Sequence, residues 1–298
     1  MKKDLLSIND LSKNEILEII SLAEKIKKSP RKYNSKLKNK VLLDIFEKPS
    51  LRTRLSFEVA MYQLGGHTIY YDLSNSPLGK GKESIEDTGK VVSRYIDVIM
   101  ARLYSQDDLI KLAKNSSIPI ISGLTDYEHP CQILGDLLTI KEKLKKLNNI
   151  KIAYFGDAEN NVTHSLIFAC SNLGIKLSIA CPKEMQPLSS VLKNSRNVDV
   201  TQDVNKAIKN ADIVYTDSWM SYQIPKSEHA KRVKILKKYQ VNSNLMKKVP
   251  KALFMHCLPA MREEEVTSDV IDSKKSIVFD QSENRLHIQK AILLKLLS

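Results

Sequence analysis

The sequence predicts an α/β protein made of two doubly wound parallel-sheet domains joined by an interdomain helix. Short apolar, β-branched runs alternate with helical stretches, a pattern typical of βαβ units and parallel sheets. The runs form a group of four and a group of five, separated by a helical segment at 129–147. A chain of 298 residues with 42% hydrophobic content is long enough to build one large or two medium domains with buried cores.

The expected strands follow in order along the chain. The first group is 41–46, 67–71, 97–102 and 118–121, and the second is 150–156, 176–181, 212–216, 252–257 and 276–280. The N-terminal 20 residues are expected to form the first helix, because they lack the apolar core and cleavage site of a secretory signal. We expect domains at 1–140 and 141–283, with an amphipathic C-terminal helix at 284–298 that packs back on the first domain.

The chain is strongly basic, with a formal net charge of +13. Only nine of its 47 basic residues are arginine, whereas proteins that read bases or grip phosphates in pairs of hydrogen bonds rely on arginine. The lysine-rich stretches 27–40 and 226–238 are therefore expected to be solvated connectors. A non-enzymatic basic protein that binds nucleic acid is the distant alternative.

The four cysteines indicate neither a disulfide framework nor a zinc site. They lie far apart, without Cys-x-x-Cys or Cys/His metal-ligand spacing, at Cys131, Cys170, Cys181 and Cys257. Reduced thiols in a cytoplasmic protein are the expected state. No run approaches the roughly 18 apolar residues of a membrane span, so we expect no membrane partner.

The segment EKPSLRTRLSFEVA at 47–60 follows the first expected strand and opens a helix. A strand that ends at a helix N-terminus directs backbone N–H groups and the positive end of the dipole at one spot, which suits a phosphate. Ser50 and Thr53 add hydroxyl groups, and Arg52 and Arg54 add fixed charge, although one arginine can instead hold the loop by an ion pair. A helix cap followed by exposed arginines is the structural alternative.

Five motifs together resemble the aspartate and ornithine carbamoyltransferase family. They occur in the family's order and cover essentially the whole chain: SLRTR (50–54), HPCQ (129–132), GDAENN (156–161), TDSWMS (216–221) and HCLP (256–259). The HCLP motif is of the ornithine type, since the aspartate enzymes have His-Pro-Leu-Pro. The resemblance implies an enzyme that transfers the carbamoyl group of carbamoyl phosphate to the side-chain amine of L-ornithine, without a metal or other cofactor.

The resemblance also implies site residues. Carbamoyl phosphate is expected to contact Ser50, Leu51, Arg52, Thr53, Arg54, Arg102, His129, Gln132, Cys257, Leu258 and Arg285. The catalytic residues among them are expected to be Arg102, His129, Thr53 and Cys257. The ornithine ligands are expected to be Asn161, Asp217, Ser221 and Tyr222. Taken singly, the paired asparagines are commonly turn residues and Asp217 a helix cap, so these structural alternatives remain open.

The chain departs from the family pattern near the amino-acid site. Tyr222 and Gln223 stand where ornithine enzymes have Met-Gly, and Pro77 stands where a neighbouring subunit often supplies glutamine. A carbamoyltransferase for another amine, such as putrescine or a modified ornithine, is therefore the nearer alternative. The family resemblance further implies a homotrimer with sites at subunit boundaries.

Overall fold

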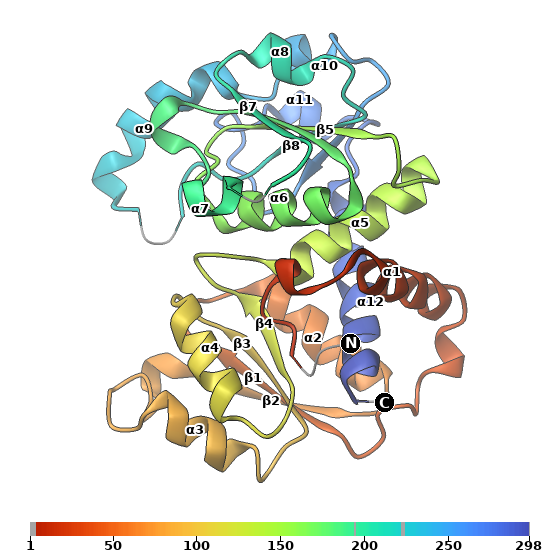
Figure 1. Ribbon diagram of the computed structural model, residues 1–298, viewed down its shortest axis with the longest axis vertical. Helices are drawn as coiled ribbons and strands as arrows, with labels where there is room; N and C mark the ends of the chain where they lie inside the picture. Colours follow the sequence, from red (N-terminus) through yellow and green to blue (C-terminus); the bar gives the residue numbers. More distant parts are fainter. Residues whose placement is uncertain (1–3, 194, 222–223, 298) are drawn as a thin grey trace. The chain divides into compact units, whose positions relative to one another are not determined.

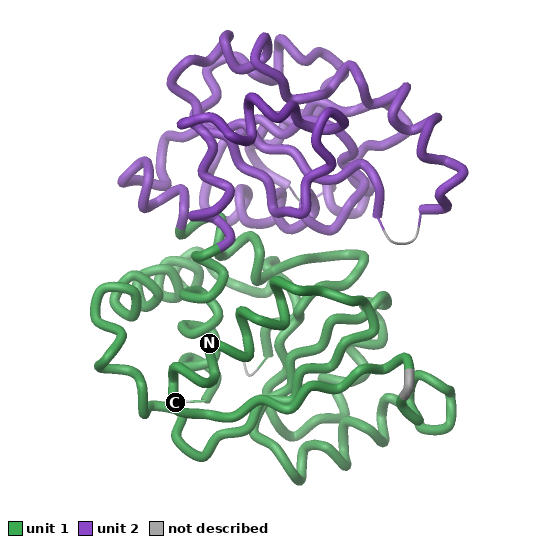
Figure 2. The backbone as a smooth tube through the Cα atoms, turned by 180° about the vertical axis from the view of Figure 1, so that it is seen from behind, with its two compact units in different colours: residues 1–138, 283–298 green, residues 139–282 purple. Residues whose placement is uncertain are grey.

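The chain folds into two compact units in the computed structural model, which describes residues 4–193, 195–221 and 224–297. Unit 1 comprises residues 1–138 and 283–298, and unit 2 comprises residues 139–282 (Figure 2). Each unit is built around one parallel sheet with helices on its faces, which confirms the predicted fold class. The C-terminal segment belongs to unit 1, so unit 1 is assembled from both ends of the chain.

Unit 1 contains a four-stranded sheet in the order β2-β1-β3-β4. Its strands are β1 (Val41–Phe46), β2 (His67–Asp72), β3 (Val98–Arg102) and β4 (Ile120–Leu124). Its helices include α1 (Lys13–Lys28), α2 (Leu51–Gln63), α3 (Ile85–Val92) and α4 (Gln106–Asn115); α5 (Pro130–Leu144) starts in it and α12 (Val278–Leu297) ends in it. Phe46 lies in register with Arg102, so the segments that follow β1 and β3 leave the sheet side by side.

Unit 2 contains a five-stranded parallel sheet in the order β7-β6-β5-β8-β9. Its strands are β5 (Lys151–Phe155), β6 (Lys176–Ala180), β7 (Val198–Thr201), β8 (Ile213–Thr216) and β9 (Leu253–His256). Its helices are α6 (Asn161–Leu173), α7 (Ser189–Leu192), α8 (Val204–Ile208), α9 (His229–Leu236), α10 (Ser243–Met246) and α11 (Ser268–Ile271). Helices α6 and α7 cover one face of the sheet, and α8, α10 and α11 lie on the other (Figure 1).

The second sheet has five strands, but one of them is not the expected one. The prediction of a strand at 276–280 is wrong: Ser276 makes a single parallel bridge to Phe254 in β9, and α12 begins at Val278. Asp280 in the first turn of α12 favours the helix there, because a carboxylate complements the positive helix end. The fifth strand is β7, an edge strand in which Asp199 is exposed between half-buried valines.

Two further expectations change in the structure. The first helix, α1, begins only at Lys13, because Ser12 and Glu15 form a capping box there; before it, Leu5 bridges to Ile121 of β4. The stretch 226–238, expected to be a connector, contains α9.

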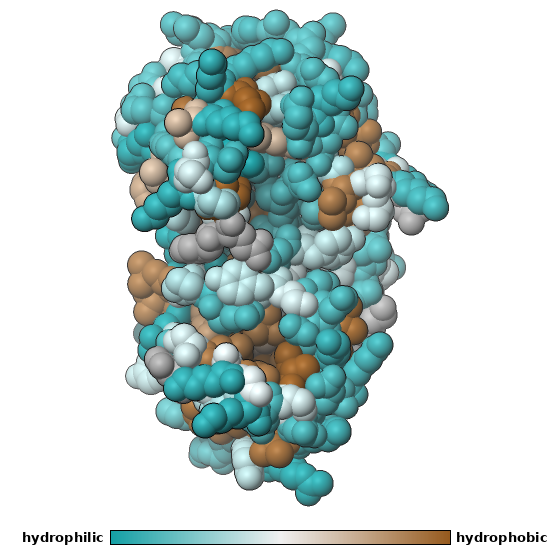
Figure 3. Space-filling model, turned by 90° about the vertical axis from the view of Figure 1, so that its left-hand side faces the viewer, coloured by the Kyte–Doolittle hydropathy of each residue, from teal (hydrophilic) through white to brown (hydrophobic). Residues whose placement is uncertain are grey.

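Hydrophilic side chains cover much of the face drawn in Figure 3, in keeping with a lysine-rich surface. No helix in the described part of the chain is long and apolar enough to cross a bilayer.

Asp44 is a buried acid in the middle of β1. It is fully buried, and neither carboxylate oxygen has a hydrogen-bond partner among the described residues. Burial raises its pKa well above the ordinary value of 3.8, nearby Glu58 raises it further, and Arg54 partly opposes both. The folded protein therefore retains this proton at pH values where the unfolded chain has released it. Its contribution to stability falls as pH rises from 3.8 through the raised folded pKa.

Replacing Asp44 by asparagine is expected to remove this loss of stability. At pH 8, Asp44→Asn should exceed the parent in free energy of unfolding by about 1–3 kcal/mol, because no buried carboxyl group has to stay protonated or ionise. Near pH 4 the difference should shrink towards zero. Urea unfolding at both pH values measures it, with exposed Asp107→Asn as the control, expected to change stability by about 0.5 kcal/mol or less. A variant that is no more stable than the parent at pH 8 would contradict the assignment.

Candidate active site

The loop between β1 and α2 carries the first group of candidate residues. Ser50 caps α2, and its Oγ accepts a hydrogen bond from the Thr53 N–H at 3.2 Å. The cap fixes the start of the helix and directs the other N–H groups of the first turn at the carboxyl end of β1. In the first turn of α2, Arg52 is half-buried and Thr53 is fully buried.

The Thr53 hydroxyl joins three distant parts of unit 1. Its Oγ1 accepts a hydrogen bond from Arg285 Nη2 of α12 at 2.8 Å and a longer one from Arg102 Nη1 at the end of β3 at 3.4 Å. Arg102 and Arg285 are 8% and 3% exposed. Two buried guanidinium groups that converge on one hydroxyl form a strongly cationic group, which suits a phosphate or a developing oxyanion.

His129, at the start of α5, is buried beside this cationic group. Burial lowers its pKa well below the ordinary value, and the charges of Arg285, Arg102, Lys48 and Arg52 lower it further. The imidazole is therefore neutral at neutral pH. A neutral imidazole still carries one N–H, so it can donate a hydrogen bond to a substrate carbonyl oxygen without adding another charge.

Gln132, one turn further along α5, presents a buried acceptor. Its Nε2 donates to Asp136 Oδ1 at 2.8 Å, while its Oε1 has no partner among the described residues. A buried acceptor without a donor is costly, and a carbamoyl NH₂ group is a donor of suitable chemistry. Gln132 thus complements an NH₂ donor such as that of a carbamoyl group, whereas Thr53 and the arginines complement an anionic group such as a phosphate.

Lys48 is a residue of this region that the sequence analysis missed. It is 5% exposed, forms an ion pair with Asp126, and places its Nζ 4.3 Å from the centre of the Tyr104 ring. Burial lowers its pKa, and the ion pair with Asp126 works in the opposite direction. Its charge acts on both Arg102 and His129. The one signal for Lys48 in the sequence was its place directly before Pro49 and Ser50, in the segment expected to bind an anion.

The structure does not bring Arg54 and the Leu51 side chain into the Thr53 group. Arg54 Nε donates to Glu58 Oε1 at 2.7 Å, and its guanidinium carbon lies 3.8 Å from the centre of the Tyr70 ring. Arg54 therefore makes an ion pair on α2, the second role that the sequence left open for one of the two arginines. The Leu51 side chain is 69% exposed, and only its backbone belongs to the capped helix start.

In unit 2, Asp217 and Cys257 come together at the ends of β8 and β9. The Cys257 thiol donates to Asp217 Oδ1 at 2.9 Å, and the same oxygen accepts from the Ser218 N–H at 2.7 Å. Both side chains are half-buried. A carboxylate beside a thiol attracts an ammonium group and repels a carboxylate, so this pair suits the amine of a basic amino acid.

His256 holds the turn that carries Cys257 and Leu258. Its Nδ1 accepts from the Leu258 N–H at 2.9 Å, and its Nε2 lies 3.1 Å from Glu265 Oε1. Leu258 adopts a φ of 56°, in the left-handed region, so this hydrogen bond stabilises a backbone conformation that leucine rarely takes.

A metal ion is a poor fit to this group. The ligand atoms of Asp217, His256 and Cys257 lie within 4.8 Å of one another. Both ring nitrogens of His256 are nevertheless engaged, one by Leu258 and one by Glu265. Metal binding would break one of these contacts and release the turn that positions Cys257.

The two asparagines after β5 have different surroundings. Asn160 caps α6: its Oδ1 accepts from the Thr163 N–H at 2.8 Å, and its Nδ2 donates to the Asp157 carbonyl at 2.7 Å. The structural alternative therefore holds for Asn160. Asn161 is half-buried in the first turn of α6, where the positive helix end favours a carboxylate such as that of an amino acid.

Arg232, on α9, is the second residue that the sequence analysis missed. It forms an ion pair with Asp157 after β5, and its Nε donates to the Trp219 carbonyl after β8 at 2.9 Å. Burial raises the pKa of Asp157 to about 6, and Arg232 opposes that rise. Arg232 thus fixes the two segments that carry Asn161 and Asp217.

Trp219 also requires a glycine at the end of β5. Gly156 has a φ of 119°, and a Cβ atom at this position would lie 2.8 Å from Trp219 Nε1.

The remaining acceptor candidates lie at the end of the described segment. Ser221 is exposed, and the Ser218 hydroxyl closes the preceding turn by donating to the Met220 carbonyl at 3.0 Å. Tyr222, predicted to contact ornithine, and Gln223 lie outside the described residues. Their roles remain predictions from the sequence.

The chain also resembles known proteins over its whole length. Residues 3–142 match the aspartate/ornithine carbamoyltransferase carbamoyl-P binding domain, and residues 148–296 match the Asp/Orn binding domain of the same family. The catabolic ornithine carbamoyltransferase of Thermoplasma volcanium is 44% identical, over 100% of this chain and 99% of that protein. The anabolic enzyme of Pyrococcus furiosus is 45% identical, over 98% of this chain and 95% of its own.

Solved structures give the same result. Ornithine carbamoyltransferase from Pyrococcus furiosus superposes with a TM-score of 0.94 at 44% identity, over 99% of this chain and 96% of that one. The Thermus thermophilus enzyme gives a TM-score of 0.92 at 39% identity, over 100% of both chains. The chain therefore belongs to the aspartate/ornithine carbamoyltransferase family and is a carbamoyltransferase.

Proposed function

We propose that this enzyme transfers the carbamoyl group of carbamoyl phosphate to the side-chain amine of L-ornithine, giving L-citrulline and phosphate. The observation that carries the donor half is the buried group of Thr53, Arg102 and Arg285. Neutral His129 and the open acceptor Gln132 Oε1 lie in the same unit. Together they provide positive charge for a phosphate, a donor for a carbonyl oxygen and an acceptor for an amide.

The acceptor half of the proposal rests on Asp217 and Cys257. Their polar atoms are 2.9 Å apart, and together they favour a cationic side chain over the second carboxylate of aspartate. Asn161 and the start of α6 supply a place for the α-carboxylate of the amino acid. The relatives at 44–45% identity are named for ornithine, which agrees with this choice.

The proposed reaction forms a C–N bond and breaks a C–O bond. The neutral amine attacks the carbonyl carbon, the tetrahedral intermediate places negative charge on the carbonyl oxygen, and phosphate departs with the C–O electron pair. Arg102, His129 and Thr53 stabilise the oxyanion, while Ser50, Arg52 and Arg285 hold the phosphate. An alkylammonium has a pKa of about 10.4, so the side chain of ornithine must lose a proton before it can attack. Cys257 and Asp217 then orient the neutral amine. A phosphate oxygen accepts the proton that the nitrogen releases after attack.

The proposal assigns carbamoyl phosphate to unit 1 and ornithine to unit 2, and includes a cytoplasmic homotrimer. An exposed apolar stripe in unit 1 supports self-association. Leu51, Leu55 and Tyr62 are 69%, 49% and 80% exposed at positions of α2 that share one helix face. Ile69 of the edge strand β2 is also exposed. Apolar surface of this kind is typical of protein interfaces.

The function is tested by supplying the purified enzyme with carbamoyl phosphate and one amine at a time. Phosphate release and the carbamoylated product are measured for ornithine, putrescine, lysine, N-acetylornithine and aspartate. Ornithine should give a kcat/KM at least about 100-fold above the others, because among these compounds only ornithine combines a short side-chain amine with both a free α-ammonium and an α-carboxylate. Faster turnover of another amine would reject the ornithine assignment and retain the carbamoyl transfer.

Arg102→Lys tests the role of the guanidinium group in the transition state. Lysine keeps the positive charge but loses the planar hydrogen-bond donors that converge with Thr53. We expect kcat to fall about 100- to 1,000-fold, with a much smaller change in carbamoyl-phosphate affinity. Exposed Arg94→Lys is the matched control and should retain activity. Equal, modest losses in kcat and affinity would argue against a transition-state role.

Arg232→Gln tests whether the Asp157 and Trp219 contacts position the ornithine residues. Losing the ion pair leaves Asp157 buried without its cation and frees the segment that follows Asp217. We expect the KM for ornithine to rise about tenfold, which corresponds to about 1.4 kcal/mol, while the KM for carbamoyl phosphate changes little. Steady-state kinetics in both substrates measure the difference, with exposed Arg196→Gln as the control. A parallel rise in both KM values would indicate a general loss of structure instead.

A further inference from the structure

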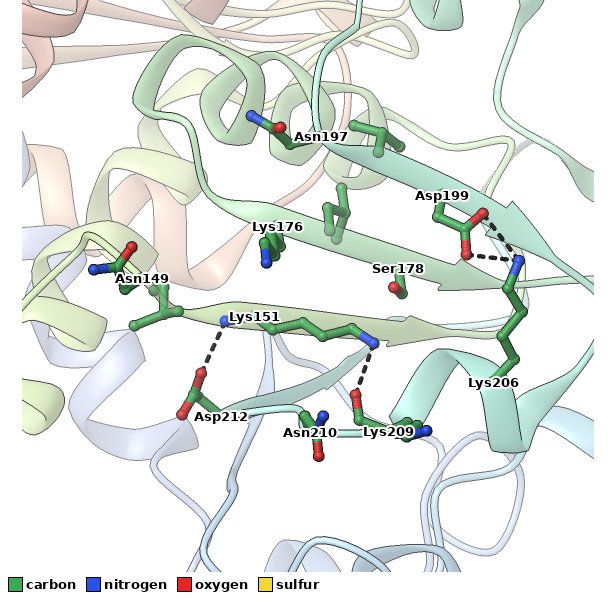
Figure 4. A pocket seen from close by; sticks show the side chains of 13 residues that line it. Asn149, Lys151, Lys176, Ser178, Asn197, Asp199, Lys206, Lys209, Asn210 and Asp212 are labelled. Carbon is green, nitrogen blue, oxygen red and sulfur yellow. Dashed lines mark hydrogen bonds and ion pairs between the residues drawn. The ribbon is translucent and has the colours of Figure 1, made fainter.

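An open pocket in unit 2 lies at the amino ends of the parallel strands, whereas the candidate ornithine ligands follow the carboxyl ends. It has a volume of about 730 Å³ and is lined by the first residues of β5, β6 and β7 and by Lys206, Lys209, Asn210 and Asp212. Four lysines and two aspartates, Lys151, Lys176, Lys206, Lys209, Asp199 and Asp212, face it (Figure 4). Their formal charges sum to +2.

The pocket exists because one face of the sheet is only partly covered. The side chains of Ala153 and Ala180 on this face pack in the core with Ala207 of α8. Helix α8 is only five residues long, so it covers the carboxyl half of the face and leaves the amino half open. Faces of parallel sheets are usually covered and apolar, but this half carries Lys151, Lys176 and Ser178.

Two of the lysines share a register position. Lys151 of β5 and Lys176 of β6 are Cα partners on neighbouring parallel strands, so their like charges lie on the same face of the sheet. Lys151 Nζ donates to the Lys209 carbonyl at 2.8 Å, a contact that offers no neutralising charge. Burial lowers the pKa of Lys151; Asp199 opposes this, and Lys176, Lys206 and Lys209 lower it further.

The two aspartates leave much of this charge uncompensated. Asp199 pairs with Lys206 at 3.1 Å, and Asp212 accepts a hydrogen bond from the backbone N–H of Lys151 at 2.8 Å. Lys176 and Lys209 are exposed, and among the described residues their ammonium groups have no hydrogen-bond or ion-pair partner. A dianion in the pocket would offset this positive charge.

The polar rim adds donors and acceptors for the rest of a ligand. Asn149, Asn197 and Asn210 precede β5, β7 and β8, and their side chains surround the lysines (Figure 4). The Ser178 hydroxyl also lines the pocket. A volume of about 730 Å³ is within the range of small-molecule sites and larger than an inorganic phosphate requires.

We infer that this pocket binds a small phosphorylated metabolite through its phosphomonoester dianion. Lys151, Lys176 and Lys209 hold the phosphate, and the asparagines and Ser178 contact the remainder of the molecule. The inference is independent of the proposed reaction, whose donor residues lie in unit 1.

Equilibrium dialysis with labelled inorganic phosphate at fixed ionic strength tests the site. The full-length parent is compared with Lys151→Gln/Lys176→Gln and with Lys247→Gln, an exposed lysine outside the pocket. The double variant should bind one phosphate fewer per chain, whereas Lys247→Gln should match the parent. The double variant should also be at least as thermally stable as the parent without phosphate, because the repulsion is gone. An unchanged phosphate count, or an equal loss in Lys247→Gln, would overturn the proposal.

This result is separable from the proposed function. If unit 1 binds no phosphate, the parent count falls by one, but the difference between the parent and the double variant remains one. Competition then separates the two sources of phosphate. Glycerol 3-phosphate should displace label from the pocket at several-fold lower concentration than unlabelled phosphate. Displacement only at equal or higher concentration, or tighter competition by a short DNA duplex, would reject a small organic phosphate as the ligand.

Discussion

The convergence of Arg102 and Arg285 on the Thr53 hydroxyl is the constraint on which the donor side of this enzyme depends. Two guanidinium groups would repel each other in a buried setting, and the shared acceptor offsets part of that cost. Three segments must be in place for this contact: the start of α2, the end of β3 and α12. The fold of unit 1 therefore serves to hold positive charge that an anionic substrate later compensates.

The same charge determines the protonation state of its neighbour. His129 stays neutral because it is buried and surrounded by cations, so it can act as a donor without adding to the repulsion. Unit 2 follows the opposite principle, since its candidate ligands Asp217 and Cys257 offer a carboxylate and a thiol rather than cationic groups. His256 and Arg232 fix the turns that carry them. The Thr53 group is thus chemically suited to an anion and the Asp217–Cys257 pair to a cation.

Local patterns were sufficient to predict the four strands of the first sheet and four of the five strands of the second, because apolar, β-branched runs are visible in the sequence. They failed where context decides: the apolar run 276–280 becomes the start of α12, and the half-exposed edge strand β7 has no apolar run to reveal it. The residues that meet at Thr53 could be predicted from motifs, whereas Lys48 and Arg232 could not. Lys48 is important through its ion pair with Asp126, and Arg232 through its contacts with Asp157 and Trp219; these partners are distant in sequence.

The return of α12 to unit 1 has a consequence for biosynthesis. Unit 2 is one continuous stretch, 139–282, and all its strands are available once that stretch has left the ribosome. Unit 1 lacks Arg285 and its closing helix until residues 283–298 follow. In a nascent chain, Thr53 and Arg102 therefore lack their partner Arg285 until the segment that follows unit 2 has been made. Chaperones that protect emerging chains would meet this enzyme with its N-terminal half still unfinished.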